Sequence, residues 1–144
     1  MRVKDKITTS QLLTMIKNST SFEAVSAYYD DVGEPTFHDV LYEMMDSRGI
    51  RPVDLISLTG IERTYFYHIL NGTKKPGRNM VLRCGLALQM TLAETNRLLQ
   101  LAGCSALYSR IRRDAVLIFA VNNKYTMEQA NELLQQEGEE PLYR

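Results

Sequence analysis

Apolar residues recur along this chain at intervals of three and four positions, which places them on one side of an α-helix. Two short helices are predicted within the first 36 residues. Thr8 with Gln11 and Thr20 with Glu23 have the spacing of capping boxes, so these threonines are expected to begin the two helices. The two apolar faces consist of Leu12, Leu13 and Ile16, and of Phe22, Val25 and Tyr29.

A polar segment that contains Gly33 and Pro35 follows, and it is the best linker in the chain. A third helix is expected to begin at Thr36 and to end near Gly49. Its core stripe consists of Phe37, Val40, Leu41, Met44 and Met45. Because helices with apolar faces must bury them, the first two helices either pack on the main domain or bind a partner.

Residues 50–76 organise the rest of the chain, and they predict two short helices, a tight turn between them and a basic loop after them. Gly60 lies where the chain must turn, because glycine accepts a positive φ without steric cost. The second helix ends at Asn71-Gly72, a favourable C-cap pair. Its inward residues are Phe66, Ile69 and Leu70, and its outer residues are Arg63, Thr64, Tyr67 and His68. A polar helix face beside a basic loop is the physical description of a helix-turn-helix that reads DNA.

The order of residues here resembles the phage-repressor-like (XRE-type) helix-turn-helix family. The resemblance covers about residues 37–88 without a gap, and it is carried by Ile56, Gly60, Phe66, Gly72 and the run Thr73-Lys74-Lys75-Pro76. It implies an all-α, lambda-repressor-like bundle. Ile56 and Leu70 replace the alanine and glutamate that are commoner in the family. Glu62 stands where a serine or threonine usually caps the recognition helix, and it brings a carboxylate near the predicted DNA surface.

The resemblance assigns the recognition helix to about residues 62–71 and implies two groups of DNA contacts. Base edges in the major groove are expected to meet Arg63, Thr64, Tyr67 and His68. Phosphates are expected to meet Arg51, Tyr65, Asn71, Thr73, Lys74, Lys75 and Arg78.

From residue 78 onward the chain repeats itself with an offset of 35 residues, so that Arg78 aligns with Arg113. Each copy reads as a helical hairpin whose second helix begins at Thr91 or Thr126. The period is similar to that of stacked helical-hairpin repeats, although two copies are too few for a solenoid. The predicted domains are an N-terminal helical arm (1–35), a helix-turn-helix domain (36–107) and a C-terminal helical hairpin packed on it (108–144).

Charge supports a local interface. The chain carries 17 basic and 17 acidic side chains, a formal net charge of zero. Between Ile61 and Arg83, however, five basic residues accompany a single acidic one. Positive charge is therefore concentrated where the motif would meet phosphates, and few phosphates can be neutralised. A second basic cluster, Ser109 to Arg113, is either solvated surface or a further phosphate contact.

Other functional classes find little support in the sequence. No apolar run approaches the ~20 residues that span a bilayer, and the N-terminus lacks the core of a secretory signal, so a cytoplasmic protein without membrane contact is expected. Cys84 and Cys104 are expected to be buried free thiols, and with two histidines they are too few for a metal site. Catalytic motifs are missing, so neither an enzyme nor a cofactor is expected.

These observations predict a bacterial or phage-type transcriptional regulator that binds double-stranded DNA as a homodimer on a palindromic site. A partner protein could bind the N-terminal helices or the C-terminal hairpin. The alternative is a protein-interaction adaptor that keeps the helix-turn-helix scaffold but reads no DNA. The zero net charge, Glu62 at the cap, the exposed tyrosines and the extra repeat motivate this alternative.

Overall fold

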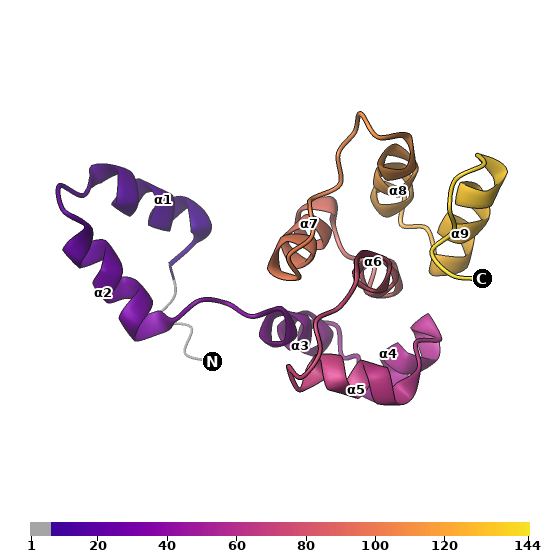
Figure 1. The fold of residues 1–144 in the computed structure, drawn as a ribbon, viewed down its shortest axis with the longest axis horizontal. Coiled ribbons are helices and arrows are strands. Elements are labelled where there is room, and N and C mark those ends of the chain that lie inside the picture. Colours follow the sequence, from indigo (N-terminus) through magenta and orange to yellow (C-terminus); the bar gives the residue numbers. More distant parts are fainter. Residues whose placement is uncertain (1–6) are drawn as a thin grey trace. The chain divides into compact units, whose positions relative to one another are not determined.

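The computed structural model describes residues 7–144, and every regular element within them is an α-helix (Figure 1). The prediction of an all-α chain is confirmed for this part of the protein. The chain divides into two compact units, Met1–Pro35 and Thr36–Arg144. The division falls at the polar segment that contains Gly33 and Pro35.

The first unit contains two helices, α1 (Thr9–Asn18) and α2 (Phe22–Val32). Thr8 begins α1 with a complete capping box, because its hydroxyl accepts from the Gln11 amide at 3.1 Å and the Gln11 side chain accepts from its own amide at 2.8 Å. The capping box predicted at Thr20 is wrong. Ser21 is the residue that precedes α2, so Ala24 occupies the third helical position and has no side-chain oxygen to complete a box.

The helices of the first unit keep much of their apolar surface exposed. None of the described side chains of α1 is buried, and Val25 is the buried residue of α2. Phe22, at the start of α2, is 67% exposed.

The second unit holds the main hydrophobic core. Its helices are α3 (Phe37–Ser47), α4 (Pro52–Thr59), α5 (Arg63–Leu70), α6 (Arg78–Ala87), α7 (Leu92–Leu101), α8 (Arg112–Asn122) and α9 (Met127–Gln136). Thr36 caps α3 by accepting from the Asp39 amide, and all the residues predicted for the core stripe of this helix are buried. α3 packs on α5 and α7, and α4 packs on α6.

The hairpins α6–α7 and α8–α9 share the local structure that the sequence repeat predicts. Thr91 and Thr126 each complete a capping box at the start of the second helix. The side-chain oxygen of Asn96 accepts from the Leu107 amide at 2.9 Å, and that of Asn131 accepts from the Leu142 amide at 2.6 Å. The segment that follows each hairpin is therefore folded back in the same way.

The two hairpins pack reciprocally, which the sequence did not predict. Arg78 donates to the Asp114 carboxylate at 3.0 Å, while Arg113 donates to the Asn79 side chain at 2.9 Å. The two donors, Arg78 and Arg113, occupy equivalent positions of the repeat. So do the two acceptors, Asn79 and Asp114. α6 contacts α9 and α7 contacts α8 in the same crosswise manner. Such exchanged contacts indicate a local two-fold axis between the hairpins, as in an isologous dimer, and not a stack that runs in one direction.

The cysteines differ in their surroundings. Cys84 is fully buried in α6, and this burial raises the pKa of its thiol to about 12. Cys104 is only partly buried, because it follows the end of α7 at the surface. The prediction of a buried thiol is therefore confirmed at Cys84 and wrong at Cys104.

Candidate nucleic-acid interface

The turn between α4 and α5 is fixed by short-range contacts. Gly60 has a φ of 68°, the left-handed conformation that glycine adopts most easily. The buried Thr59 hydroxyl donates to the Leu55 carbonyl at 2.7 Å and accepts from the Ile61 amide at 3.3 Å. From α6, the guanidinium of Arg83 donates to the Thr59 carbonyl. These contacts hold the end of α4, and therefore the start of α5, in one position.

α5 is anchored by one face and exposed on the other. Phe66, Ile69 and Leu70 are at most 3% exposed, so the helix is fixed in the core along its inner side. Arg63, Thr64 and Tyr67 are exposed, whereas Tyr65 and His68 are half-buried. Of the residues predicted to face DNA bases, Arg63, Thr64 and Tyr67 thus lie on the outer side of a helix fixed in the core, whereas His68 is partly turned inward.

Glu62 caps α5. Its carboxylate accepts from the amides of Thr64 at 2.6 Å and Tyr65 at 3.1 Å, and these hydrogen bonds hold the pKa of Glu62 below its usual value. The carboxylate therefore takes the role that serine or threonine has in the resembling family. Its negative charge lies against the positive end of the helix dipole.

Two outer residues of α5 contact each other. The Arg63 guanidinium lies over the Tyr67 ring, 5.4 Å from its centroid, one helical turn away. This contact orients Arg63 along the outer face. The Nδ1 atom of His68 is buried and finds no hydrogen-bond partner among the described residues.

The loop after α5 is held by backbone hydrogen bonds. The amides of Thr73 and Lys74 both donate to the His68 carbonyl, at 2.9 and 3.0 Å. The Asn71 side-chain oxygen also accepts from the Thr73 amide at 2.9 Å. The side-chain nitrogen of Asn71 can therefore donate to another group. Gly72 has a φ of 81°, and a Cβ there would lie 2.8 Å from Cε1 of His38 in α3. A side chain at this position would strain the backbone and would force the His38 ring to move.

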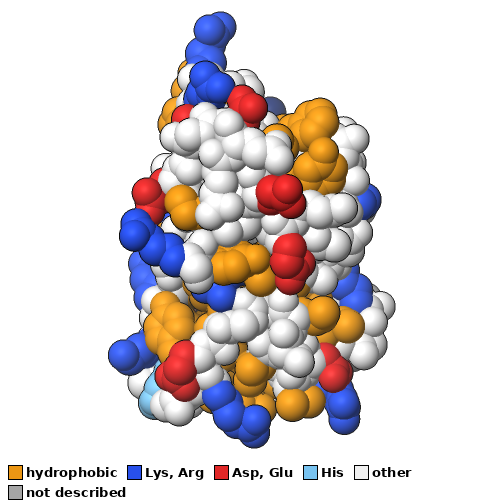
Figure 2. Space-filling view, turned by 90° about the vertical axis from the view of Figure 1, so that its right-hand side faces the viewer, with side chains coloured by type: hydrophobic (Ala, Val, Ile, Leu, Met, Phe, Trp, Pro, Cys, Tyr) orange, Lys and Arg blue, Asp and Glu red, His pale blue; other side chains and the backbone are white. Residues whose placement is uncertain are grey.

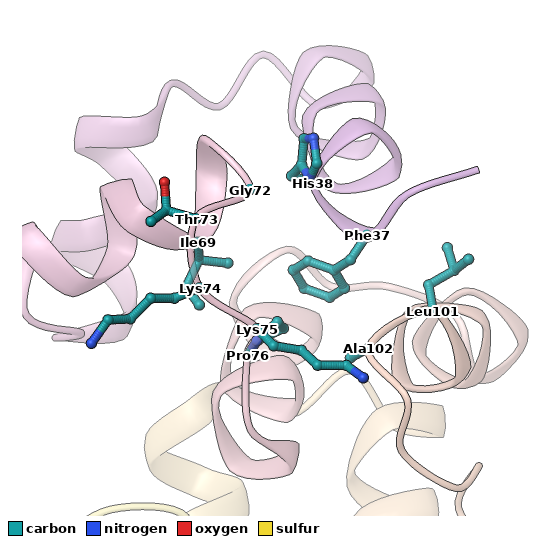
Figure 3. Close-up of a pocket in the computed structure, with 10 residues that line it drawn as sticks. All are labelled: Phe37, His38, Ile69, Gly72, Thr73, Lys74, Lys75, Pro76, Leu101 and Ala102. Atoms are coloured by element: carbon teal, nitrogen blue, oxygen red, sulfur yellow. The ribbon is translucent and has the colours of Figure 1, made fainter. Parts of the chain in front are cut away.

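The loop borders a pocket of about 270 Å³ (Figure 3). Its walls come from the start of α3, the end of α5, the loop and the end of α7. Figure 3 shows that the two lysines of the loop extend in different directions, Lys74 away from the pocket and Lys75 across it toward α7. A Cβ at Gly103 would lie 2.6 Å from Nζ of Lys75. The Lys75 ammonium thus lies at the end of α7, where the helix dipole favours a cation.

The two arginines predicted to contact phosphates, Arg51 and Arg78, form ion pairs within the chain. Arg51 bonds Asp54 at 3.0 Å, but its side chain is 75% exposed, so the pair is screened and weak. Arg78 bonds Asp114, whose side chain is only 6% exposed, and also the Ser105 carbonyl. Arg51 can leave its partner at small cost, whereas Arg78 would leave a buried carboxylate behind.

The second basic cluster is mostly engaged inside the C-terminal hairpin. Arg112 forms an ion pair with Glu137 at 2.8 Å, and Arg113 donates to the Glu140 carbonyl at 2.9 Å. Arg110 is exposed. Two of the three arginines therefore tie α8 to the acidic C-terminal segment.

Comparisons with known proteins give no match. Neither a protein-family model, nor a curated protein, nor a solved structure matches this chain. Within residues 7–144, histidine, cysteine, aspartate and glutamate side chains form no cluster of three or more that could hold a metal ion. Over the same residues, every helix is too short or too polar to cross a membrane.

The sequence did not indicate two residues that contact the loop and the turn of the candidate interface from its core side. His38 packs against Gly72, and Arg83 reaches the Thr59 carbonyl while stacking on the Tyr143 ring at 5.0 Å. Both contacts join segments far apart in the sequence. The glycines at the turn and the loop were the available signals, since glycine marks places of close approach.

Proposed function

We propose that α4 and α5 form a DNA-reading helix-turn-helix and that the protein is a sequence-specific regulator of transcription. One observation carries the proposal. The polar face of α5 is exposed beside the rigid loop that presents Lys74, while the opposite face of the helix is locked in the core. A recognition helix needs this combination, because base readout requires side chains held in a fixed register against phosphate contacts.

In this proposal Arg63 and Thr64, in the first turn of α5, meet base edges in the major groove. The planar fork of Arg63 matches the two acceptors of guanine, a contact that discriminates by about 1–3 kcal/mol against other bases. The Tyr67 ring packs against the Arg63 guanidinium. His68 is half-buried and lies at the edge of this face.

Phosphate contacts are assigned to Thr73, Lys74, the side-chain nitrogen of Asn71 and the exposed Arg51. The hydroxyl of the half-buried Tyr65 is assigned a phosphate contact at the edge of this surface. Lys75 extends toward the end of α7 and Arg78 is bonded to Asp114, so neither is assigned a phosphate contact. With so few cations facing the duplex, the salt dependence of binding is expected to be shallow, since its slope grows with each phosphate neutralised.

An eight-residue helix such as α5 reads only a few base pairs. We therefore propose that two copies bind a palindromic site, with the recognition helices one DNA turn apart. A cytoplasmic bacterial or phage-type regulator fits this mode of action.

The test is selection of bound duplexes from a random pool by the wild-type protein, by Arg63→Ala and by Arg97→Ala. Arg97 is an exposed arginine of α7 and serves as a matched control. The proposal expects the wild type and Arg97→Ala to enrich the same palindrome and Arg63→Ala to lose it. If all three proteins enrich nothing at low salt, the proposal fails.

The second candidate is a protein-interaction adaptor built on the same helices. It is favoured by the exposed apolar residues of α4, Val53 at 42% and Leu58 at 47%, because such side chains suit a protein partner. An adaptor would show no sequence enrichment. Its partner binding would be weakened by Leu58→Ser and unchanged by Arg63→Ala.

A further inference from the structure

The outer surface of the C-terminal hairpin is mixed in character. Figure 2 looks onto the side of the molecule that carries α8 and α9, where hydrophobic side chains reach the surface in patches between charged groups. Such a surface does not indicate one broad site for a partner. The contact that distinguishes this hairpin lies instead on the side that faces α6. There the ring of Tyr143, in the segment after α9, stacks on the Arg83 guanidinium with 5.0 Å between the ring centroid and Cζ.

The backbone of Tyr143 is held by the C-terminal hairpin. The side-chain oxygen of Asn131 in α9 accepts from the amides of Leu142 at 2.6 Å and Tyr143 at 3.4 Å. The side-chain nitrogen of Asn131 donates to the Tyr143 carbonyl at 3.1 Å. Asn131 is 7% exposed, and the neighbouring Leu142 belongs to the core at 4%. The segment after α9 therefore has a defined course where it meets α6.

Arg83 connects Tyr143 to the turn between α4 and α5. Its Nη2 atom donates to the Thr59 carbonyl, and a Cβ at Gly60 would lie 3.7 Å from the same atom. This carbonyl belongs to the last turn of α4, where carbonyls have no partner inside the helix. The Nε atom of Arg83 is buried and has no hydrogen-bond partner within residues 7–144. The guanidinium is therefore positioned by the Thr59 carbonyl on one side and by the Tyr143 ring on the other.

The repeat shows that this stacking is not a general feature of the hairpin packing. At the 35-residue offset, Tyr143 corresponds to Tyr108 and Arg83 corresponds to Ile118. The second pair contains no cation, and Tyr108 is 56% exposed whereas Tyr143 is half-buried. The local two-fold axis thus relates two tyrosines, of which the one beside the helix-turn-helix faces an arginine. Since α6 is the helix that packs on α4, the arginine stands in the copy from which it reaches the turn.

We propose that Tyr143 is a positioning residue for the recognition helix, through which the C-terminal hairpin braces the turn between α4 and α5. With the ring in place, the guanidinium of Arg83 is confined against the Thr59 carbonyl. The Thr59 hydroxyl in turn accepts from the Ile61 amide at 3.3 Å, so the position of Thr59 fixes the residues that begin α5. Without the ring, water reaches Nε and offers the guanidinium other partners. The importance of the brace for DNA rests on the proposed function, whereas its effect on the turn does not.

The first test measures hydrogen exchange of the Gly60 and Ile61 amides in the full-length protein without DNA. Tyr143→Ala is expected to raise both exchange rates roughly two- to thirtyfold, the range that corresponds to the loss of a cation–π contact. Tyr143→Phe keeps the ring and is expected to exchange like the wild type. Tyr108→Ala removes the equivalent tyrosine of the other copy and is the matched control, so it is expected to leave both amides unchanged.

Two further measurements separate positioning from a general loss of stability. In Tyr143→Ala the amides of α3 are expected to exchange at the wild-type rate, because the opening is confined to the turn. A uniform rise across the core would show instead that Tyr143 is merely structural. Arg83→Met removes the guanidinium but keeps a long apolar side chain. Arg83→Met alone and Arg83→Met with Tyr143→Ala are expected to give equal exchange at Gly60 and Ile61, because Tyr143 acts through Arg83.

The second test measures binding to the palindrome that the wild type selects. Tyr143→Ala is expected to weaken this binding roughly two- to thirtyfold and to leave binding to an unrelated duplex unchanged, because base readout needs a fixed register and phosphate attraction does not. Tyr143→Phe is expected to bind like the wild type. If the wild type selects no DNA, the proposed function fails, and the exchange rates still decide whether Tyr143 braces the turn.

Three results would overturn the proposal. Exchange at Gly60 and Ile61 that is unchanged in Tyr143→Ala, or raised equally by Tyr108→Ala, would show that the stacked ring does not hold the turn. Rates that multiply when Tyr143→Ala is added to Arg83→Met would contradict the route through Arg83. Full affinity of Tyr143→Ala for the palindrome would show that the recognition helix needs no such brace.

Discussion

The arginines Arg78 and Arg113 occupy equivalent positions of the repeat, but their loss is expected to have unequal consequences. Arg78 pairs with the carboxylate of Asp114, whose side chain is 6% exposed, whereas Arg113 pairs with the neutral side chain of Asn79. Arg78→Ala removes the ion-pair partner of a nearly buried carboxylate, a loss that typically costs about 3–5 kcal/mol, and leaves Asp114 with the Tyr108 amide as its hydrogen-bond donor. Since the Arg78 side chain is itself 29% exposed, water compensates in part, and we expect about 2–3 kcal/mol.

Arg113→Ala removes hydrogen bonds to neutral acceptors and is expected to cost about 1 kcal/mol. Asp114→Asn provides the decisive comparison, because it converts the ion pair into the arginine–asparagine pair of the other copy. It is expected to cost less than Arg78→Ala, and the double variant Arg78→Ala with Asp114→Asn is expected to recover part of the lost stability. The free energy of unfolding is measured by urea titration of the helical circular dichroism.

Equal losses for Arg78→Ala and Arg113→Ala would refute the argument that the buried charge decides. If Arg78→Ala lowered the free energy of unfolding by almost nothing, the argument would also be refuted. Arg78 would then be free to contact a phosphate.

Further predictions concern the loop and the cap of α5. Gly72→Ala is expected to lower the melting temperature, because it combines a φ of 81° with a Cβ 2.8 Å from the His38 ring, and His38→Ala in the same chain is expected to relieve the clash but not the backbone strain. The folded-state pKa of Glu62 is depressed, so the stability that its carboxylate contributes is present at neutral pH and is lost as the pH falls through this folded-state pKa. Glu62→Gln is therefore expected to flatten the acid-unfolding profile in that pH range. An unchanged profile would contradict the role of Glu62 as a cap. In salt titrations of DNA binding, Lys74→Ala is expected to reduce the slope by about one, as for the loss of a phosphate contact, and Lys75→Ala by clearly less; equal reductions would contradict the separate roles given to the two lysines.

Much of the local structure could be predicted because its causes lie within a few residues. The capping boxes at Thr8, Thr91 and Thr126 and the left-handed turn at Gly60 depend on contacts three or four positions apart. The failure at Thr20 has the same origin, since a shift of one residue in the helix start removes the box.

The packing between distant segments could not be predicted in this way. The 35-residue repeat was visible, but the local two-fold axis depends on Arg78 reaching Asp114 and Arg113 reaching Asn79 across the hairpins. Neither pairing leaves a mark in residue spacing. The same holds for the folded-back course of Lys75 against Gly103, which gives this lysine a different place from its neighbour Lys74.

For the candidate interface, the sequence indicated which side chains lie on the outer face of α5, and it could not indicate which of the surrounding cations are already engaged. The charge of a residue is known from its type, but its availability depends on partners brought together by the fold. Arg51, Arg78 and Lys75 all carry a positive charge, but the fold gives them different partners.

The central claim is that Arg63 reads a base from α5, and binding to single-base-pair variants of the selected palindrome tests it most directly. For each half-site position, affinities of the wild type and of Arg63→Ala are compared at one fixed salt concentration. The account predicts that the wild type loses about 1–3 kcal/mol when one particular G·C pair is changed, and that Arg63→Ala loses this discrimination at that position while retaining it at the others. If Arg63→Ala weakened binding to every variant equally, or left the discrimination intact, α5 would not read DNA through Arg63.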